Sequence, residues 1–196
     1  MRARDINKVE LVKQKAIELL VELGFEGFTM NKLAKACGVS VATLYIYYKD
    51  KDDLIQNIGL EEVQRMSAIM LEDFDPESSF AEGLRQQWKN RAKCILENPL
   101  TAQMIEQLRS STYQEKIFQT FGEIFKEPLG KFMHNAIERE EIVDMPLESY
   151  WSVAFGPLYS LLRFHNEGKS LSGKPFVLTD EVLWSAFDVV LKGLKK

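Results

Sequence analysis

Hydroxyl, aromatic and lysine side chains gather in one short stretch of the chain, FTMNKLAKACGVSVATLYIYYKDKDDL at residues 28–54. Hydroxyls, phenols and ammonium groups all bind the phosphate oxygens of nucleic acids. Apolar residues between them would meet thymine methyl groups rather than hydrogen-bond to purines. The stretch therefore predicts a DNA contact in which polar residues hold the backbone and apolar residues touch bases. The polar residues are Thr29, Ser40, Thr43, Tyr45, Tyr47, Lys49 and Lys51, and the apolar ones are Val41, Ala42 and Ile46.

The charge of the chain is unevenly distributed. Its 196 residues carry a formal net charge of -4. Residues 1–52 contain nine Lys and Arg against seven Asp and Glu, so the acidic excess lies in the remainder. An acidic protein can still bind nucleic acid where its positive charge is local. The distribution favours an N-terminal DNA-binding part.

Short helices separated by turn residues would position these side chains. Thr29 offers its hydroxyl as the N-cap of a helix that Gly38 ends, and Ser40 offers its hydroxyl to a third helix running to about Tyr47. This order of elements predicts a helix-turn-helix, whose third helix enters the major groove. Ala34 is small enough to let the second helix approach the third closely, and Leu33, Val39 and Leu44 are spaced to fill the space beneath the turn. Tyr48 follows Leu44 by one helical turn, so we expect it to pack there and not on DNA.

Helical periodicity continues through the rest of the chain. A helix over 5–23 precedes the turn and ends at Gly24, a candidate left-handed cap. Asp50 is the expected N-cap of the fourth helix. No strand alternation is present, so the sequence predicts an all-α protein of about nine helices. The later helices are predicted over 51–71, 80–96, 99–110, 114–125, 129–139, 147–166 and 179–194.

Residues from about Ala16 to Ile58 resemble the tetracycline-repressor (TetR/AcrR) family of transcriptional regulators. The resemblance is carried by Gly24-Phe25, Phe28-Thr29, Leu33-Ala34, Gly38-Val39-Ser40, Thr43-Leu44-Tyr45, Tyr47-Tyr48, Lys51 and Leu54. The family usually has Phe where Tyr48 stands and Glu near Asp52. The resemblance implies a helix-turn-helix domain at residues 1–52 and a helical domain at residues 53–196 that dimerises and binds a small inducer. It also implies a homodimer that represses from a palindromic operator, with Thr29, Ser40, Thr43, Tyr45, Tyr47 and Lys51 on the DNA backbone.

The last two predicted helices offer apolar faces for the dimer that the resemblance implies. Paired with their copies they would form a four-helix interface. The alternative, that these faces form a core within one chain, stays open. The predicted interface residues are Tyr150, Val153, Ala154, Pro157, Leu158, Leu161, Leu162, Leu183, Ala186, Val190 and Leu191.

Aromatic residues recur at helical spacing in the middle of the chain. A mostly apolar cavity with a few polar groups is what a ligand site requires, so we expect a hydrophobic or aromatic ligand. The alternative is a solidly packed aromatic core. The predicted pocket residues are Trp88, Arg91, Met104, Gln107, Phe118, Phe121, Phe125, Trp151, Phe155 and Tyr159, with Tyr113, His134 and Arg163 as further polar groups.

No catalytic or metal-binding pattern accompanies these features. The sequence has no nucleophile motif, no Gly-rich phosphate loop and no Cys/His cluster with zinc spacing. Nothing orients Cys94 and His134 as a nucleophile and base, and both cysteines are expected to be reduced thiols. The chain lacks a secretory signal and an apolar run of about 18 residues. We expect a cytoplasmic protein that is not an enzyme and uses no cofactor or metal.

Two other functions stay open from the sequence. The C-terminal domain could serve only dimerisation in a ligand-independent DNA-binding protein. The acidic segment LEDFDPESS at residues 71–79 could instead dock another protein, although a solvated loop explains the same residues. A ligand cavity would distinguish these functions from a ligand-responsive regulator.

Overall fold

A computed structural model describes the backbone of residues 3–196 and the side chains from Lys8 onward. Nine helices lie within residues 3–196: α1 (Ala3–Gly27), α2 (Met30–Cys37), α3 (Val41–Leu44), α4 (Lys51–Met70), α5 (Phe80–Glu97), α6 (Pro99–Arg109), α7 (Gln114–Glu138), α8 (Leu147–Glu167) and α9 (Asp180–Leu194). No β-strand forms in this part of the chain, where isolated backbone bridges pair Ile142 with Lys195 and Lys169 with Pro175. The predicted all-α fold is confirmed.

The chain divides into two compact units. Unit 1 contains the residues up to Arg65 together with Asn98–Gly122, and unit 2 contains Met66–Glu97 and Glu123–Lys196. Helices α4 and α7 each contribute residues to both units. This division by packing differs from the predicted boundary between residues 52 and 53, because α1 packs against α6, which comes after that boundary. As a boundary between functions, the division at 52 and 53 stays a prediction.

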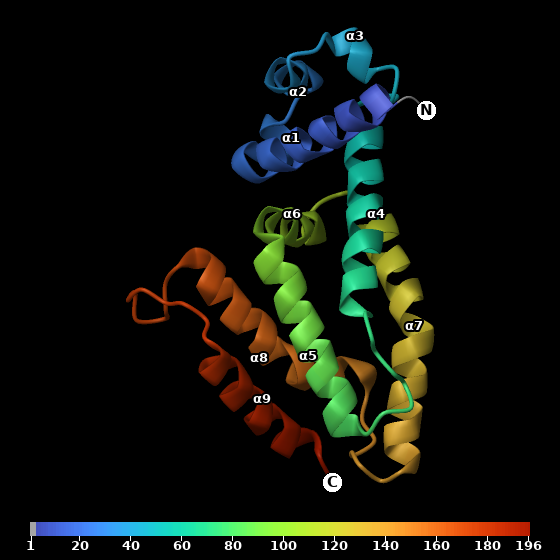
Figure 1. The fold of residues 1–196 in the computed structure, drawn as a ribbon, viewed down its shortest axis with the longest axis vertical. Helices are drawn as coiled ribbons and strands as arrows, with labels where there is room; N and C mark the ends of the chain where they lie inside the picture. The colour runs from blue at the N-terminus through green and yellow to red at the C-terminus, as the bar shows by residue number, and fades with distance from the viewer. Residues whose placement is uncertain (1–2) are drawn as a thin grey trace. The chain divides into compact units, whose positions relative to one another are not determined.

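Unit 1 is built around one apolar cluster that joins the first helices to α6 and the start of α7. Leu20 of α1, Leu33 of α2 and Leu44 of α3 have no exposed surface. Leu108 and Ile117 belong to the same cluster. Residues 98–122 are therefore part of the core that supports α1, α2 and α3, whose arrangement Figure 1 shows.

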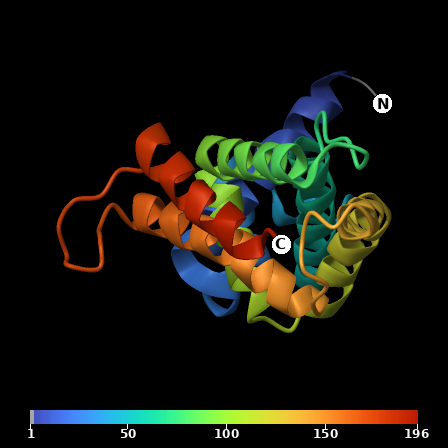
Figure 2. The ribbon, with the colours of Figure 1, turned by 90° about the horizontal axis from the view of Figure 1, so that it is seen from below.

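Unit 2 packs α5 against α8 and α9, and Figure 2 shows α8 and α9 side by side. Large aromatic side chains fill its core. Trp88 is fully buried, its indole Nε1 donates to the carbonyl oxygen of Ala154 at 2.8 Å, and its ring meets Phe187 edge-on at 5.4 Å between centroids. Phe132 stacks on Phe80, with ring centroids 5.8 Å apart.

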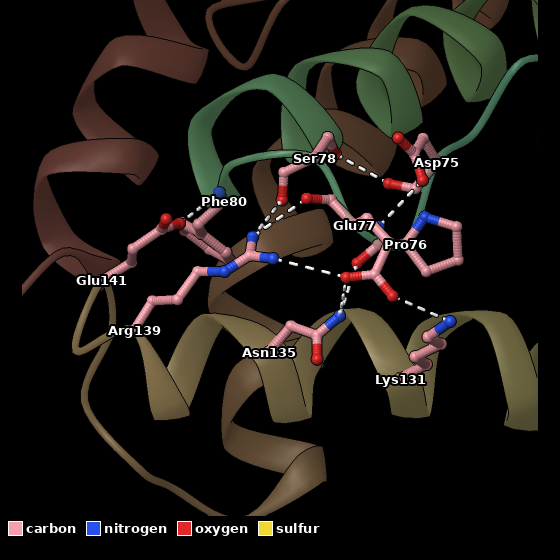
Figure 3. A network of polar contacts seen from close by, with 9 residues as sticks. All are labelled: Asp75, Pro76, Glu77, Ser78, Phe80, Lys131, Asn135, Arg139 and Glu141. Atoms are coloured by element: carbon pink, nitrogen blue, oxygen red, sulfur yellow. Dashed lines mark hydrogen bonds and ion pairs between the residues drawn. The ribbon is translucent and has the colours of Figure 1, made fainter.

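The segment before α5 is held by a polar network centred on Glu77 (Figure 3). The Glu77 carboxylate pairs with Lys131 at 2.8 Å and with Arg139 at 3.3 Å. It also accepts a hydrogen bond from the Asn135 amide at 3.0 Å. Nearby, the carboxylate of Glu141 accepts a hydrogen bond from the backbone N–H of Phe80. These contacts tie the acidic segment to α7 and the residues after it, so it is not a freely solvated loop.

Helix α7 corrects one sequence prediction. Two helices were expected over 114–125 and 129–139, but α7 runs unbroken through Pro128. Proline lacks the N–H that would bond to the carbonyl four residues earlier. One missing bond does not end a helix whose apolar face is buried on both sides of it, by Phe125, Leu129 and Phe132.

Helix α1 also departs from its prediction. Gly24 has a positive φ of 67°, as expected of a glycine that breaks a helix, but its ψ of 174° is extended and not left-handed helical. This conformation is open almost only to glycine. The chain then makes one further turn to Gly27, and Phe28 N–H bonds to the Gly24 carbonyl at 3.1 Å.

Within residues 3–196 no helix is both long and apolar enough to cross a membrane. The same residues contain no group of three His, Cys, Asp or Glu side chains placed to hold a metal ion.

Candidate nucleic-acid interface

The turn between α2 and α3 has the predicted capping geometry. Thr29 Oγ1 accepts a hydrogen bond from Lys32 N–H at 3.2 Å and starts α2. Gly38 ends that helix in the left-handed conformation, with φ 64° and ψ 32°. The turn is closed by Val39 N–H, which bonds to the Ala34 carbonyl at 3.0 Å. The local chemistry of these residues therefore sets the angle at which α3 leaves α2.

Helix α3 starts at the predicted cap but is shorter than predicted. Ser40 Oγ accepts from Thr43 N–H at 3.2 Å and lies 2.9 Å from the Thr43 hydroxyl. The helix ends at Leu44 and not near Tyr47. Beyond Leu44 the chain tightens, since Tyr47 N–H reaches back only three residues, to the Leu44 carbonyl at 3.0 Å. Residues 45–47 therefore form turns that carry side chains outward.

The predicted DNA-contacting side chains are mostly exposed on one short segment. Tyr45, Ile46 and Tyr47 are 52%, 76% and 40% exposed. Thr29, Ser40, Ala42 and Lys49 are exposed as well, whereas Val41, Thr43 and Lys51 are half-buried. Two exposed aromatic rings and an exposed isoleucine thus stand at consecutive positions near Lys49. Contiguous exposed apolar surface of this kind is typical of interaction sites. The segment therefore has the character of a contact surface.

Tyr48 behaves differently from its neighbours. It is 9% exposed and belongs to the apolar cluster of unit 1. Burial, together with the negative charges of Glu61, Glu10 and Asp53, raises the pKa of its phenol to about 12. The prediction that Tyr48 packs under α3 is confirmed.

Lys51 and Asp52 fix the start of α4 through contacts that the sequence did not indicate. Lys51 Nζ donates to the Phe25 carbonyl oxygen at 2.5 Å. The Tyr113 hydroxyl donates to Asp52 Oδ1 at 2.6 Å, and the Tyr113 ring lies 5.4 Å from that of Phe25. Lys51 therefore already has a partner within the chain, in addition to its expected role on DNA. Tyr113, expected in a ligand pocket, thus braces the start of α4.

The N-terminus of α4 is capped as predicted. Asp53 N–H donates to Asp50 Oδ1 at 2.8 Å, and Lys49 N–H donates to Asp53 Oδ2 at 2.9 Å. The two carboxylates thus satisfy backbone donors on both sides of the cap. This reciprocal pair holds Lys49 in place beside the exposed tyrosines.

Six of the predicted pocket residues lie in unit 2. Arg91 is fully buried, and the rings of Phe125, Trp151 and Phe155 lie within 5.1 Å of its guanidinium carbon. The Tyr159 hydroxyl accepts from Arg91 Nη1 at 2.8 Å. These five side chains are therefore gathered around one guanidinium, and their role as a ligand pocket stays a prediction. The sixth, Trp88, has its hydrogen bond and its ring contact inside the core.

The other predicted pocket residues lie in unit 1. Met104 is buried in the apolar cluster, against which Phe118 and Phe121 are partly buried. Gln107 Nε2 donates to the Val21 carbonyl at 3.3 Å and links α6 to α1. Arg109 lies over the Phe118 ring at 4.4 Å. Helical spacing alone could not assign these side chains to one unit or the other.

Two further polar groups expected in a pocket are on the surface. His134 is exposed, and Arg163, whose side chain is 64% exposed, pairs with Glu167 at 3.8 Å. The prediction that they contribute to a cavity is wrong. Both lie next to apolar residues in sequence, and helical spacing did not show that their side chains point to solvent.

The predicted dimer face is divided by the fold. Its buried members, Tyr150, Ala154, Leu158, Leu162, Leu183 and Val190, form part of the core of unit 2. Its remaining members, Val153, Pro157, Leu161, Ala186 and Leu191, keep some exposed surface. Val189, which the sequence reading left out, is 70% exposed. A partner subunit could therefore meet only the outer part of α8 and α9.

Comparison with known proteins matches residues 14–58 to the family described as bacterial regulatory proteins, tetR family. An uncharacterized HTH-type transcriptional regulator of Haemophilus influenzae is 31% identical over 110 residues, which are 56% of this chain and 59% of that protein. The fatty acid metabolism regulator protein of Bacillus subtilis is 30% identical over 69 residues, 35% of this chain and 36% of that protein. The chain thus matches less than two thirds of the length of either relative.

The likeness in structure extends further than the likeness in sequence. The crystal structure of a TetR family transcription regulator from Marinobacter aquaeolei superposes with a TM-score of 0.86 and 26% sequence identity, and the match covers 100% of both chains. The similarity therefore includes the helices after residue 58 as well as the turn between α2 and α3.

Proposed function

The chain belongs to the TetR family of bacterial regulatory proteins, and from this membership we propose that it is a repressor that binds a palindromic DNA operator as a homodimer. The observation that carries the proposal is the exposed segment Tyr45–Tyr47, placed by a capped helix-turn-helix and flanked by Lys49. Such an activity requires no catalytic group, and we expect the protein in the cytoplasm, where bacterial DNA lies.

The chemistry of the segment supports DNA-backbone contact with modest base reading. Thr29, Ser40 and Tyr47 present hydroxyls, and Lys49 presents a positive charge, all suited to phosphate oxygens. Ala42 and Ile46 present only apolar surface to base edges, which suits thymine methyl groups. We therefore expect the operator to be distinguished in part by its shape and deformability.

A dimer follows from the small size of one such contact. A single helix-turn-helix covers one half-site, and two half-sites lie about 34–36 Å apart on B-DNA. The outer parts of α8 and α9, with Val153 and Val189 exposed, are our candidates for the contact between subunits. The two α3 segments would then read the two arms of an inverted repeat.

Release from DNA would be controlled by a small ligand of unit 2. Helices α4 and α7 each contribute residues to both units, so a ligand that prefers one position of either helix would bias the placement of α3. Coupling of about 1–3 kcal/mol is typical and corresponds to a roughly 5- to 150-fold loss of operator affinity. A ligand that bound both conformations equally would have no effect.

Selection of bound sequences from a random duplex pool would test the proposal. We expect an inverted repeat, and we expect Tyr47→Ala to weaken binding to it while Leu171→Ala, which alters an 89% exposed leucine in the loop after α8, leaves binding unchanged. Lys49→Ala should reduce the slope of log K against log salt concentration by about 1, which corresponds to the loss of one phosphate contact. Absence of an enriched motif at low salt, or equal binding by the Tyr47 and Leu171 variants, would refute the proposal.

A further inference from the structure

A buried arginine in unit 2 has no acidic partner among the side chains that the structure describes. Arg91 of α5 has no exposed surface. Its hydrogen bonds go only to neutral groups: Nη1 donates to Tyr159 Oη at 2.8 Å and to Met70 Sδ at 3.5 Å, and Nη2 donates to Gln87 Oε1 at 3.1 Å. Its Nε has no hydrogen-bond partner among the residues that the structure describes. From Lys8 onward, no side chain therefore supplies a countercharge to this buried positive charge.

The unsatisfied Nε of Arg91 lies on one edge of the guanidinium. Nε–H and one N–H of Nη2 share this edge of the planar group, and together such donors match the two oxygens of a carboxylate. Arginine cannot lose its proton to escape the cost of burial. Removing a charge from water is unfavourable unless another charge or several hydrogen bonds replace the water. An anion at this edge would supply both.

Aromatic rings surround the same group. The guanidinium carbon lies 4.4 Å from the ring centroid of Phe155, 5.0 Å from that of Phe125 and 5.1 Å from that of Trp151. Ring faces attract a cation and keep water away from it, but they do not accept the in-plane N–H bonds. They therefore offset part of the cost of burial, leave the edge unsatisfied, and present apolar surface to whatever binds there.

A second buried donor without a partner comes from α4. Ser67 has no exposed surface, and its Oγ has no hydrogen-bond partner within the described residues. Ser67 precedes Met70 by three residues, so the two lie on the same face of the helix, and Met70 Sδ is in contact with Arg91. A serine hydroxyl can donate to a carboxylate oxygen. Two neighbouring helices thus each hold a buried polar group with an unmet hydrogen bond.

We propose that Arg91 binds the carboxylate of an organic anion with an apolar body, and that Ser67 contributes a further hydrogen bond to it. The carboxylate would take the Nε edge of the guanidinium, and the apolar body would lie against the rings of Phe125, Trp151 and Phe155. Only one part of this proposal rests on the proposed function, namely that the bound anion regulates DNA binding. Carboxylate binding itself is a property of unit 2 and is measured without DNA.

The test compares two arginines of the same helix in the full chain. Arg85 also lies over an aromatic ring, 3.9 Å from the centroid of Trp184, but it is exposed, so Arg85→Met is the matched control for Arg91→Met. Isothermal titration calorimetry would measure binding of decanoate and naphthoate, with decanamide and naphthamide as neutral counterparts. We expect wild type and Arg85→Met to bind at least one carboxylate about tenfold or more tightly than its amide. Arg91→Met should lose this preference.

The thermal midpoint distinguishes ligand binding from a purely structural role of Arg91. A purely structural role predicts that loss of the arginine lowers the midpoint. Replacing a buried unpaired charge by an apolar side chain of similar length should leave the thermal midpoint unchanged or raise it. Should Arg91→Met fold poorly, Arg91→Lys keeps the charge and loses the planar edge, and it should weaken carboxylate binding in a folded protein.

Several results would overturn the proposal. One is equal carboxylate affinity in wild type and Arg91→Met, or in wild type and Arg91→Lys. Another is the absence of binding of both carboxylates to wild type at millimolar concentration. A third is a clearly lowered thermal midpoint in Arg91→Met with no change in ligand preference. Failure to find an operator would refute the proposed function and leave these binding results unaffected.

Discussion

Replacing Gly83 by alanine places a methyl group where unit 2 has no room for it. Gly83 is buried in α5, and a Cβ built on it overlaps Phe132 Cε2 and lies 2.6 Å from Phe132 Cζ and 2.8 Å from Ser78 Oγ. The Phe132 ring cannot move aside easily, since it is 1% exposed and packs against Phe80 and Phe74, with centroids 5.8 Å and 5.2 Å away. The substitution must therefore disturb the aromatic core.

The expected magnitude is the difference between two opposing terms. Overpacking of a well-filled core costs about 1–3 kcal/mol, and alanine gains about 1 kcal/mol over glycine in a helix interior. With rings on both sides of Phe132 we expect the upper half of the overpacking range and a net loss of about 1–2 kcal/mol. In a chain of this size that lowers the thermal midpoint by about 2–8 °C.

Gly130→Ala is the control for this prediction. Gly130 lies inside α7, is exposed, and has nothing within 4 Å of a built Cβ. The helix-propensity gain should act there alone, so the midpoint should rise by about 2–4 °C. Thermal unfolding of the two variants followed by circular dichroism would measure both shifts. Equal stabilisation by both substitutions would refute the close packing of α5 on Phe132.

Two further predictions concern two helix caps and the contact of Tyr113 with Asp52. Ser40→Ala removes the N-cap of α3 in unit 1, and Thr179→Ala removes that of α9 in unit 2, where Thr179 Oγ1 accepts from Val182 N–H at 3.3 Å. Each should cost about 1 kcal/mol of unfolding free energy in urea titrations. Only Ser40→Ala should also weaken operator binding, and equal operator affinity would contradict the placement of Ser40 on DNA. Burial and the hydrogen bond to Asp52 raise the pKa of Tyr113 from 10.0 to about 12. The folded protein therefore favours the protonated phenol. This contribution to stability is complete below pH 10 and is lost as the pH rises through about 12. Asp52→Asn should lower that pKa, measured by tyrosinate absorbance against a Tyr113→Phe blank, and an unchanged value would exclude the Asp52 contact.

Local rules were sufficient for the helix-turn-helix. The hydroxyls of Thr29 and Ser40 and the conformation of Gly38 are determined by neighbours within four residues, so capping chemistry predicted them from the sequence. Burial of Tyr48 followed from helical spacing in the same way. The predicted contacts of these residues with DNA stay predictions, since they depend on a partner and not on the chain.

Long-range packing limited the remaining predictions. Which apolar residues of α8 and α9 face inward depends on α5, and Val189 and Val190 are adjacent in sequence while only Val190 is buried. The hydrogen bond of Tyr113 was not predicted, because its partner, Asp52, is 61 residues away. The surroundings of Arg91 could not be predicted either, because the neutral character of its described hydrogen-bond partners depends on which helices pack around it.

The composition of unit 1 bears on how such regulators could be recombined. Residues 98–122 supply Leu108 and Ile117 to the core beneath α1, and Tyr113 to the brace on Asp52. A chimaera that exchanged only residues 1–65 for those of a relative would pair one protein's helix-turn-helix with the other's α6. Transfer of a DNA specificity should therefore succeed only when residues 1–65 and residues 98–122 are exchanged together.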